Sequence, residues 1–216
     1  APEVIDVPPA DSFRRPPRLS LAIRGVGGQG NLFFGKVLAQ VAFLAGYDDR
    51  NILKGETHGM AQMGGPVIST FGCGEVFSPA LVPGTANVLI AMEKAEVLRP
   101  GFLDLLEPGG TVLMADTRIL PHGLKPEAYP SDEAIAAQLE GYRVVSVDVL
   151  SIALNLGDPK GRCANVAMLG VLSTLPPFDV VPEAVWLQAL RGISRKPALW
   201  DLNHAAFMAG RGMQKG

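Results

Sequence analysis

The chain has 216 residues and a formal net charge of −2, and 48% of its residues are hydrophobic. This length favours a single domain with one sizeable core. The charge balance supplies no basic stripe for nucleic acid, and no apolar run reaches the roughly 18–20 residues of a membrane span. Because no basic-then-apolar leader pattern is present either, the sequence predicts a cytoplasmic protein that binds neither nucleic acid nor membranes.

The cysteine content bears on redox chemistry. Cys73 and Cys163 are 90 positions apart and belong to no CxxC motif. This spacing argues against an iron–sulfur cluster or a structural zinc held by this chain. We therefore expect no metal site in the chain, and any redox centre must lie on another component.

Residues 1–18, "APEVIDVPPADSFRRPPR", contain five prolines and follow neither a helical nor a strand period. Such a segment is typical of an extended arm or linker. A linker to another domain and an arm that docks onto a folded surface are equally compatible with the sequence.

From Leu19 the pattern alternates between strands and helices. Continuous apolar runs of strand length, as expected for parallel strands buried on both faces, are "LSLAIRGV", "NVLIAM", "TVLMAD" and "YRVVSVDV". Helical spacing is found at 31–46, where Gly46 ends the helix, and at 131–139. Residues 93–110 are expected to form a crossover helix that Pro100 interrupts.

The remaining segments complete the predicted fold. Residues 66–74 are β-branched and alternating, which favours an antiparallel part of the sheet, and the chain after Asp148 is predicted to be mainly helical. We predict an α/β fold: a doubly wound, mostly parallel Rossmann-like sheet flanked by helices, with a helical C-terminal tail. The expected divisions are the arm at 1–18, the α/β domain at 19–175 and a helical extension of it at 176–216.

A glycine turn follows the first predicted strand. In "IRGVGGQGNLFFGK", Gly25 would allow a tight exit from the strand, Gly27 a close approach to a ligand, and Gly30 helix packing. The start of the next helix presents free N–H groups and a positive dipole end, which suit a pyrophosphate. The alternative is a tight turn without a ligand.

A dinucleotide site needs more than this turn. It requires an acidic residue about 20 positions on, at the end of the second strand, to hold the ribose hydroxyls. Asp48 and Asp49 have this separation but precede the candidate strand, and the first acid after it is Glu56. An NAD(P)- or FAD-dependent dehydrogenase and a nucleotide-sensing regulatory domain are therefore kept as alternatives.

A polar, glycine-rich loop, "GETHGMAQMGG", is predicted after that second strand. Because loops at the carboxyl ends of strands meet at one crevice, Lys54, Glu56, Thr57 and His58 are expected near the glycine turn. For His58 the alternative is an ordinary loop histidine. Asn165 begins an apolar helical run, where it could cap the helix or reach a ligand.

Three segments together, "GVGGQGNLFFGKVLA", "KGETHGMAQMGGPVIST" and "NVAMLGVL", resemble the gamma-type domain of the 2-oxoacid:ferredoxin oxidoreductases. Within that family they are most similar to the beta subunit of the indolepyruvate enzymes. The resemblance covers roughly residues 19–175. It implies a component of an enzyme that oxidatively decarboxylates an aryl 2-oxoacid to its acyl-CoA and passes the electrons to ferredoxin.

The resemblance also implies how the cofactors are divided. Coenzyme A would bind at a site shared with this chain, whereas thiamine diphosphate, magnesium and iron–sulfur clusters would lie on partner domains. The chain would not be active alone.

Site roles follow from the same resemblance. The coenzyme A phosphates would face Gly27, Gly28, Gln29 and Gly30, with Lys54 as a charge partner and Asn165 near the nucleotide. Residues 56–58 would lie toward the thiamine site of the partner. Met63 departs from the basic residue expected at its position, which removes one contact to a phosphate or the partner.

Overall fold

The computed structural model describes residues 4–25, 28–58, 67–76, 78–120, 123 and 125–213. Within them, six strands form one sheet in the order β2-β3-β1-β4-β5-β6. The strands are β1 (Arg18–Gly25), β2 (Ile52–His58), β3 (Val67–Gly74), β4 (Ala86–Ala91), β5 (Leu106–Ala115) and β6 (Arg143–Val147).

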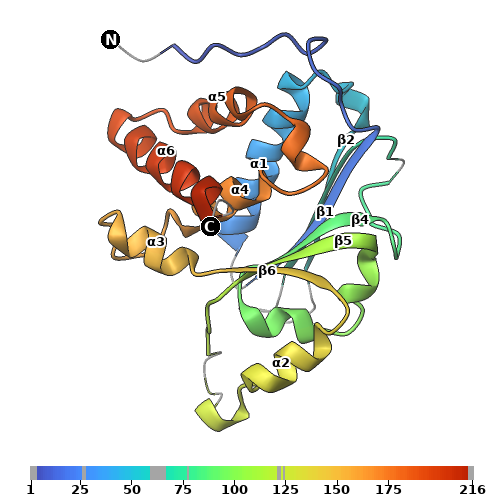
Figure 1. Cartoon of the computed structure of the whole chain (residues 1–216), viewed down its shortest axis with the longest axis vertical. Helices are drawn as coiled ribbons and strands as arrows, with labels where there is room; N and C mark the ends of the chain where they lie inside the picture. The colour runs from blue at the N-terminus through green and yellow to red at the C-terminus, as the bar shows by residue number, and fades with distance from the viewer. Residues whose placement is uncertain are drawn as a thin grey trace.

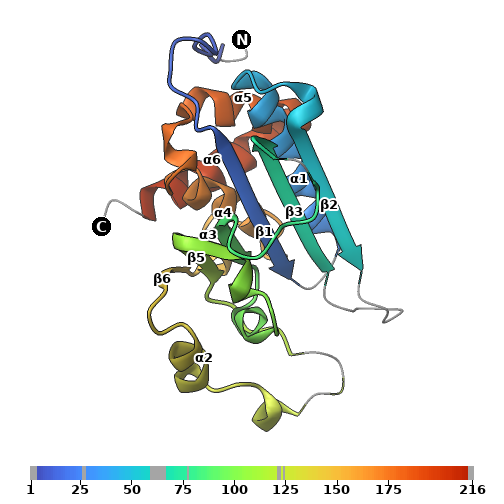
Figure 2. The same cartoon turned by 90° about the vertical axis from the view of Figure 1, so that its right-hand side faces the viewer.

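Only β3 runs against the other strands of this sheet. β1, β4, β5 and β6 pair in parallel, while β3 is antiparallel to both β1 and β2, so β2 points in the same direction as β1. Figure 2 shows the arrowheads of β1 and β2 at one edge, with β3 reversed between them. The predicted α/β fold is confirmed, and the β-branched segment pairs antiparallel as expected.

Helices cover both faces of the sheet. They are α1 (Gly28–Leu44), α2 (Asp132–Gln138), α3 (Val149–Asn155), α4 (Ala164–Leu172), α5 (Glu183–Ile193) and α6 (Pro197–Gly212). Figure 1 shows α2 on the opposite side of β6 from α3 and α6. Two separate buried clusters correspond to these faces: a large one beneath α1 and α3–α6, and a smaller one that includes Ile135 of α2 and Leu139, the residue that caps the end of α2.

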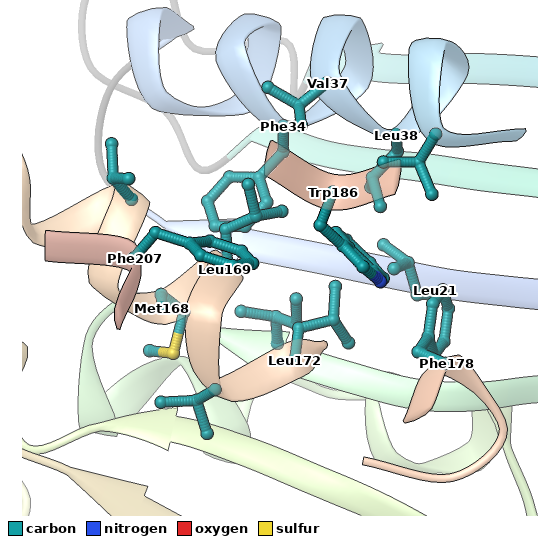
Figure 3. Packing of buried hydrophobic residues seen from close by; sticks show 14 of the residues in the cluster. Leu21, Phe34, Val37, Leu38, Met168, Leu169, Leu172, Phe178, Trp186 and Phe207 are labelled. Atoms are coloured by element: carbon teal, nitrogen blue, oxygen red, sulfur yellow. The ribbon is translucent and has the colours of Figure 1, made fainter. Parts of the chain in front are cut away.

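The large cluster joins the C-terminal helices to the sheet. Trp186 of α5 is fully buried, and its ring lies 6.5 Å from that of Phe207 in α6 and 6.3 Å from that of Phe178. Figure 3 shows these rings beside Phe34 of α1 and Leu21 of β1. The helices after residue 176 are thus packed against the same core as the strands.

Helices α4 and α6 cross with their backbones in contact. A Cβ atom at Gly170 would lie 2.1 Å from the carbonyl oxygen of Phe207, and one at Gly210 would lie 2.0 Å from that of Ala167. No side chain fits at either position. Glycine is therefore required at both positions for α6 to lie so close to α4.

The crossover between β4 and β5 differs from the prediction. Residues 93–110 form two short 3-10 helices, η2 (Lys94–Leu98) and η3 (Leu103–Leu105), and β5 already begins at Leu106. Pro100 lies between the two short helices, and Gly101 after it has a φ of 79°. Proline and a left-handed glycine together prevent a continuous α-helix, so the expected crossover helix is wrong.

The proline-rich arm docks against the domain at the amino-terminal edge of the strands. Arg15 donates to the carbonyl of Gly46 and lies over the ring of Tyr47, whose hydroxyl donates to Pro16 O at 2.7 Å. Burial raises the pKa of Tyr47 well above its usual value, which keeps this donor protonated. Val7 and Phe13 also pack against the large core. We call these contacts the arm clasp.

Replacing Gly170 with alanine tests the helix crossing. We expect Gly170→Ala to lower the free energy of unfolding by about 2–3 kcal/mol, because its methyl group would overlap the Phe207 carbonyl. A Cβ at Gly192 in α5 meets nothing within 4 Å, so Gly192→Ala should be neutral or stabilising by up to about 1 kcal/mol. Urea denaturation measures both. Equal effects of the two substitutions would contradict the crossing.

The arm clasp can be tested through the Tyr47 hydroxyl. Tyr47→Phe should destabilise the protein by about 1 kcal/mol, since the Pro16 carbonyl loses its donor. Cleavage within residues 4–17 by a protease should also become faster. Tyr142→Phe, at a tyrosine that is 39% exposed, is the control and should change neither measurement. Unchanged cleavage in Tyr47→Phe would show that the clasp does not depend on this hydrogen bond.

Candidate functional site

The glycine turn lies at the carboxyl edge of the sheet. β1 ends at Gly25 and α1 begins at Gly28, with no acidic residue in its first turn. The free N–H groups and the positive dipole end of this 17-residue helix therefore face the edge where β1 ends. Gly27 and the side chain of Gln29 lie outside the described residues.

Gly25 was predicted to allow a tight turn at the end of the strand. In the structure, the absence of a side chain at Gly25 also lets the end of β1 lie close to the residue that follows β4. A Cβ on Gly25 would lie 2.7 Å from the Cβ of Met92, the residue after β4. The Met92 N–H also donates to Arg24 O at 2.8 Å. These contacts hold the ends of β1 and β4 side by side.

A buried ion pair supports this edge from the α2 face. The Arg24 Nε lies 3.1 Å from Glu96 Oε2, and the two side chains are only 9% and 4% exposed. Arg24 also lies over the ring of Phe102, 5.8 Å from its centroid. The pair ties η2 to β1 directly behind the glycine turn.

β1 and β4 form the topological switch point of the sheet. After β1 the chain passes to one face through α1, and after β4 it passes to the other face through η2 and η3 (Figure 1). Open α/β sheets bind their ligands in the crevice between two such strand ends. The glycine turn therefore occupies the place where the fold itself favours a ligand.

Lys54 lies in β2, as predicted, and Glu56 lies in the same strand and not in a loop after it. β2 continues to His58 because its residues pair with β3, with Glu56 opposite Ser69. The expectation of a polar loop beginning at Glu56 is thus wrong, since antiparallel pairing extends the strand. The side chains of Thr57 and His58 lie outside the described part of the chain. Met63 also lies outside it.

Lys54 is exposed and lies against α1. A Cβ added at Gly35 of α1 would be 3.5 Å from the Lys54 Cδ, so the side chain runs along the second turn of that helix. Strand alternation places Glu56 on the same face of the sheet. These two charges flank one side of the amino-terminal half of α1.

Asn165 lies on the other side of α1. It is in the first turn of α4, where Cys163 holds the N-cap position, and it does not cap the helix. A cavity of about 420 Å³ is lined by Asn165, Asn203 and Arg162 together with Phe33 of α1. The structure thus brings Asn165 close to α1, as the ligand interpretation requires.

The structure weakens the dinucleotide alternative. The parallel neighbour of β1 is β4, and the acid that follows it is Glu93, which is 3% exposed. Its carboxylate accepts from Ala95 N at 3.1 Å, from Ile119 N at 3.4 Å and from the Tyr129 hydroxyl. Glu93 is therefore committed to internal hydrogen bonds and does not present its carboxylate to a ribose.

A second set of charges at this edge was missed from the sequence. Lys94 forms ion pairs with Asp116 at 2.6 Å and Asp132 at 3.1 Å, and Arg118 pairs with Asp132 at 2.6 Å. Hydrogen bonding to Asp116 raises the pKa of Lys94, and the bonds from Lys94 and Arg118 lower that of Asp132. The signal was available in part, because Asp116 is the last residue of a predicted parallel strand.

Among the residues that the structure describes, no group of three His, Cys, Asp or Glu side chains could hold a metal ion. Burial raises the pKa of the Cys73 thiol to about 12 and that of Cys163 to about 11. Over the same residues, no helix is long and apolar enough to cross a membrane.

The chain belongs to the pyruvate ferredoxin/flavodoxin oxidoreductase family, whose model it matches over residues 20–213. The predicted membership of the 2-oxoacid:ferredoxin oxidoreductases is thereby confirmed, and the protein is a component of such an oxidoreductase.

Two relatives are similar to the chain in sequence, and one solved structure is similar to it in fold. It is 35% identical to indolepyruvate oxidoreductase subunit IorB of Archaeoglobus fulgidus over 159 residues, covering 72% of this chain and 76% of the relative. Identity to IorB of Thermococcus kodakarensis is 33% over 197 residues, or 88% and 93% of the two chains. The crystal structure of pyruvate oxidoreductase subunit PORC from Thermotoga maritima has the same fold, with a TM-score of 0.65, 20% identity and coverage of 90% and 96%.

The buried ion pair behind the glycine turn gives a testable prediction. Glu96→Gln should lower the free energy of unfolding by about 3 kcal/mol, because it leaves the Arg24 charge buried without its partner. The double variant Arg24→Met/Glu96→Leu should recover most of this loss. Arg99→Ala removes a half-exposed partner of Glu96 and should cost less than about 1 kcal/mol. Denaturation measures the free energy of unfolding of each variant. A Glu96→Gln variant at least as stable as Arg99→Ala would contradict the role of Glu96 as the partner of the buried Arg24 charge.

Proposed function

We propose that this chain is the subunit that contributes the coenzyme A site to a thiamine-diphosphate-dependent oxidoreductase acting on indolepyruvate or another aryl 2-oxoacid. The observation that carries the proposal is the position of the glycine turn. It leads into α1, whose first turn holds no acidic residue, at the switch point between β1 and β4, with Lys54 on one side of α1 and Asn165 on the other. This arrangement suits a phosphorylated ligand.

Each part of the edge has a separate role in this proposal. The backbone of residues 27–30 would hold the phosphates of coenzyme A, and Lys54 would add a positive charge. Asn165 would contact the nucleotide from the cavity beside α1. The backbone of β2 carries Glu56, Thr57 and His58 toward the same edge, where they would face the thiamine site of the partner.

The remaining chemistry belongs to partner components. Thiamine diphosphate with its magnesium ion would stabilise the carbanion left by decarboxylation, and iron–sulfur clusters would carry two electrons to ferredoxin. This chain would bind and orient the acyl acceptor. The two IorB relatives, at 33–35% identity, support indolepyruvate as the substrate.

Kinetics of the assembled enzyme test the proposed site. With indolepyruvate and a viologen acceptor, Lys54→Ala and Gln29→Ala should each raise the KM for coenzyme A about tenfold or more, as expected for losing a hydrogen bond to a charged group. The KM for indolepyruvate should stay unchanged, because that substrate binds the partner. Initial rates at varied coenzyme A measure both constants.

Arg50→Ala provides the control. Arg50 precedes β2 at the opposite edge of the sheet, and its side chain is 87% exposed, so this variant should behave like the unmodified protein. Pyruvate and phenylpyruvate in place of indolepyruvate test the substrate class. An isolated chain that binds NAD(P) or flavin, or an assembled enzyme indifferent to coenzyme A, would refute the proposal.

A further inference from the structure

A cavity lies at the amino-terminal edge of the sheet, at the opposite end of β1 from the glycine turn. It is bounded by the arm and by the starts of β1, β4 and β5, and its volume is about 430 Å³. Small-molecule sites typically measure roughly 300–1,000 Å³. Two pairs of prolines line part of it, Pro16 with Pro17 in the arm and Pro176 with Pro177 after α4. Because proline has no N–H group, these parts of the wall are apolar and offer no backbone donor.

An irregularity in β5 places a carboxylate in this cavity. Between the paired positions of the two strands, β4 has only Asn87, whereas β5 has residues 107–110. Bulged segments of this kind leave the ladder and redirect their side chains. The Glu107 carboxylate accepts from Arg18 Nη2 at 2.8 Å and from Asn87 Nδ2 at 2.7 Å. The bulge therefore builds a polar cluster where a regular ladder would continue.

This polar cluster is held in place by the surrounding backbone. Asn87 is 5% exposed, and its Oδ1 accepts from Ser20 N at 2.8 Å. A Cβ at Gly110 would lie 2.9 Å from Asn87 O, so the bulge packs directly against β4. Pro17 O accepts from Glu75 N at 2.9 Å, which holds the arm against the end of β3. A preorganised site of this kind binds a ligand without a large ordering cost.

The charges in the lining favour a cationic ligand. Arg18 contributes one positive charge, and Glu75 and Glu107 contribute two negative charges. The Arg18 charge is committed to Glu107, since its Nη2 makes the ion pair and its Nε is buried. Glu75 is exposed, and within the described part of the chain its carboxylate has no ion-pair partner. The matching group carries a positive charge and only donates hydrogen bonds, as guanidinium and ammonium groups do.

A guanidinium suits this cavity better than an ammonium. It is planar and more weakly hydrated, so it loses less on leaving water for a wall of proline rings. Its fork of N–H donors also matches a carboxylate in a bidentate pair.

We propose that the cavity binds a guanidinium group, with Glu75 as its charge partner at the rim and Glu107 as a second acceptor inside. The group belongs to a small guanidine or to an arginine side chain of another component of the enzyme. This inference does not depend on coenzyme A, because the cavity and the proposed coenzyme A site lie at opposite edges of the sheet.

Titration of the full chain with N-butylguanidine tests the inference by NMR. The amide signals of Gly109 and Gly110, which line the cavity, should shift as the ligand binds. Glu75→Gln keeps the shape of the side chain but removes its charge, so it should raise the Kd about tenfold or more. Glu140→Gln, at an exposed glutamate after α2, is the matched control and should leave the Kd unchanged.

Two further ligands test the chemical class. N-Butylurea, which has a similar shape but no charge, should not shift the Gly109 and Gly110 signals, and butylamine should bind more weakly than N-butylguanidine. Equal binding of the urea, or tighter binding of the amine, would overturn the guanidinium assignment. The site itself would be refuted by signals that do not shift with N-butylguanidine, or by the same Kd in Glu75→Gln and Glu140→Gln.

The assembled enzyme separates the two sources of the guanidinium. An arginine of another component would occupy the cavity, so the assembly would not bind N-butylguanidine, and Glu75→Gln would weaken subunit association about tenfold. A small guanidine would instead leave the cavity free, so the assembly would bind N-butylguanidine as tightly as the isolated chain does. Either result supports a guanidinium site and identifies its ligand.

Discussion

The backbone contact between α4 and α6 is the constraint on which the helical face of the sheet depends. Because Gly170 and Gly210 have no side chains, each helix approaches the carbonyl groups of the other. This brings α6 close enough for Phe207 to reach Trp186 of α5. The same crossing fixes α4, whose first turn carries Asn165 toward α1. A larger residue at either glycine would therefore affect packing and the candidate site together.

The carboxyl edge is fixed in a different way, through contacts between strand ends. Gly25 against Met92 joins β1 to β4, and Arg24 with Glu96 joins β1 to η2. These contacts fix the end of β1 from which the chain leads into α1. Under the proposed function, preorganised N–H groups at the start of α1 would bind an anion without a large ordering cost.

Much of the fold could be predicted from local signals in the sequence. Buried strands such as β4 are continuous apolar runs, and Gly46, with a φ of 84°, ends α1 where the pattern indicated. Predictions failed where pairing partners decided the outcome. Glu56 looked like a loop residue because glycines surround it, but pairing with β3 keeps it in a strand. The crossover after β4 was predicted as one helix that Pro100 interrupts, but Pro100 followed by the left-handed Gly101 leaves only two short 3-10 helices.

The candidate site was predictable only where it coincided with a motif. The glycine turn and Lys54 belong to contiguous segments, and the family resemblance rests on them. A cavity on the α2 face is built by Lys94, Asp116, Asp132 and Ser146. These residues come from four different elements or their flanks, and no local pattern connects them. Only the strand order places them at the same edge as Gly25.

The arm clasp and the glycine turn lie at opposite ends of β1 (Figure 2). Eight residues of extended chain separate them by about 25 Å. Free-energy changes at sites this far apart, with no shared partner, are generally additive. Substitutions in the arm can therefore change the stability of the domain without altering the proposed ligand site at the other end of β1. Selection can therefore act on stability and on the proposed ligand site as two independent traits.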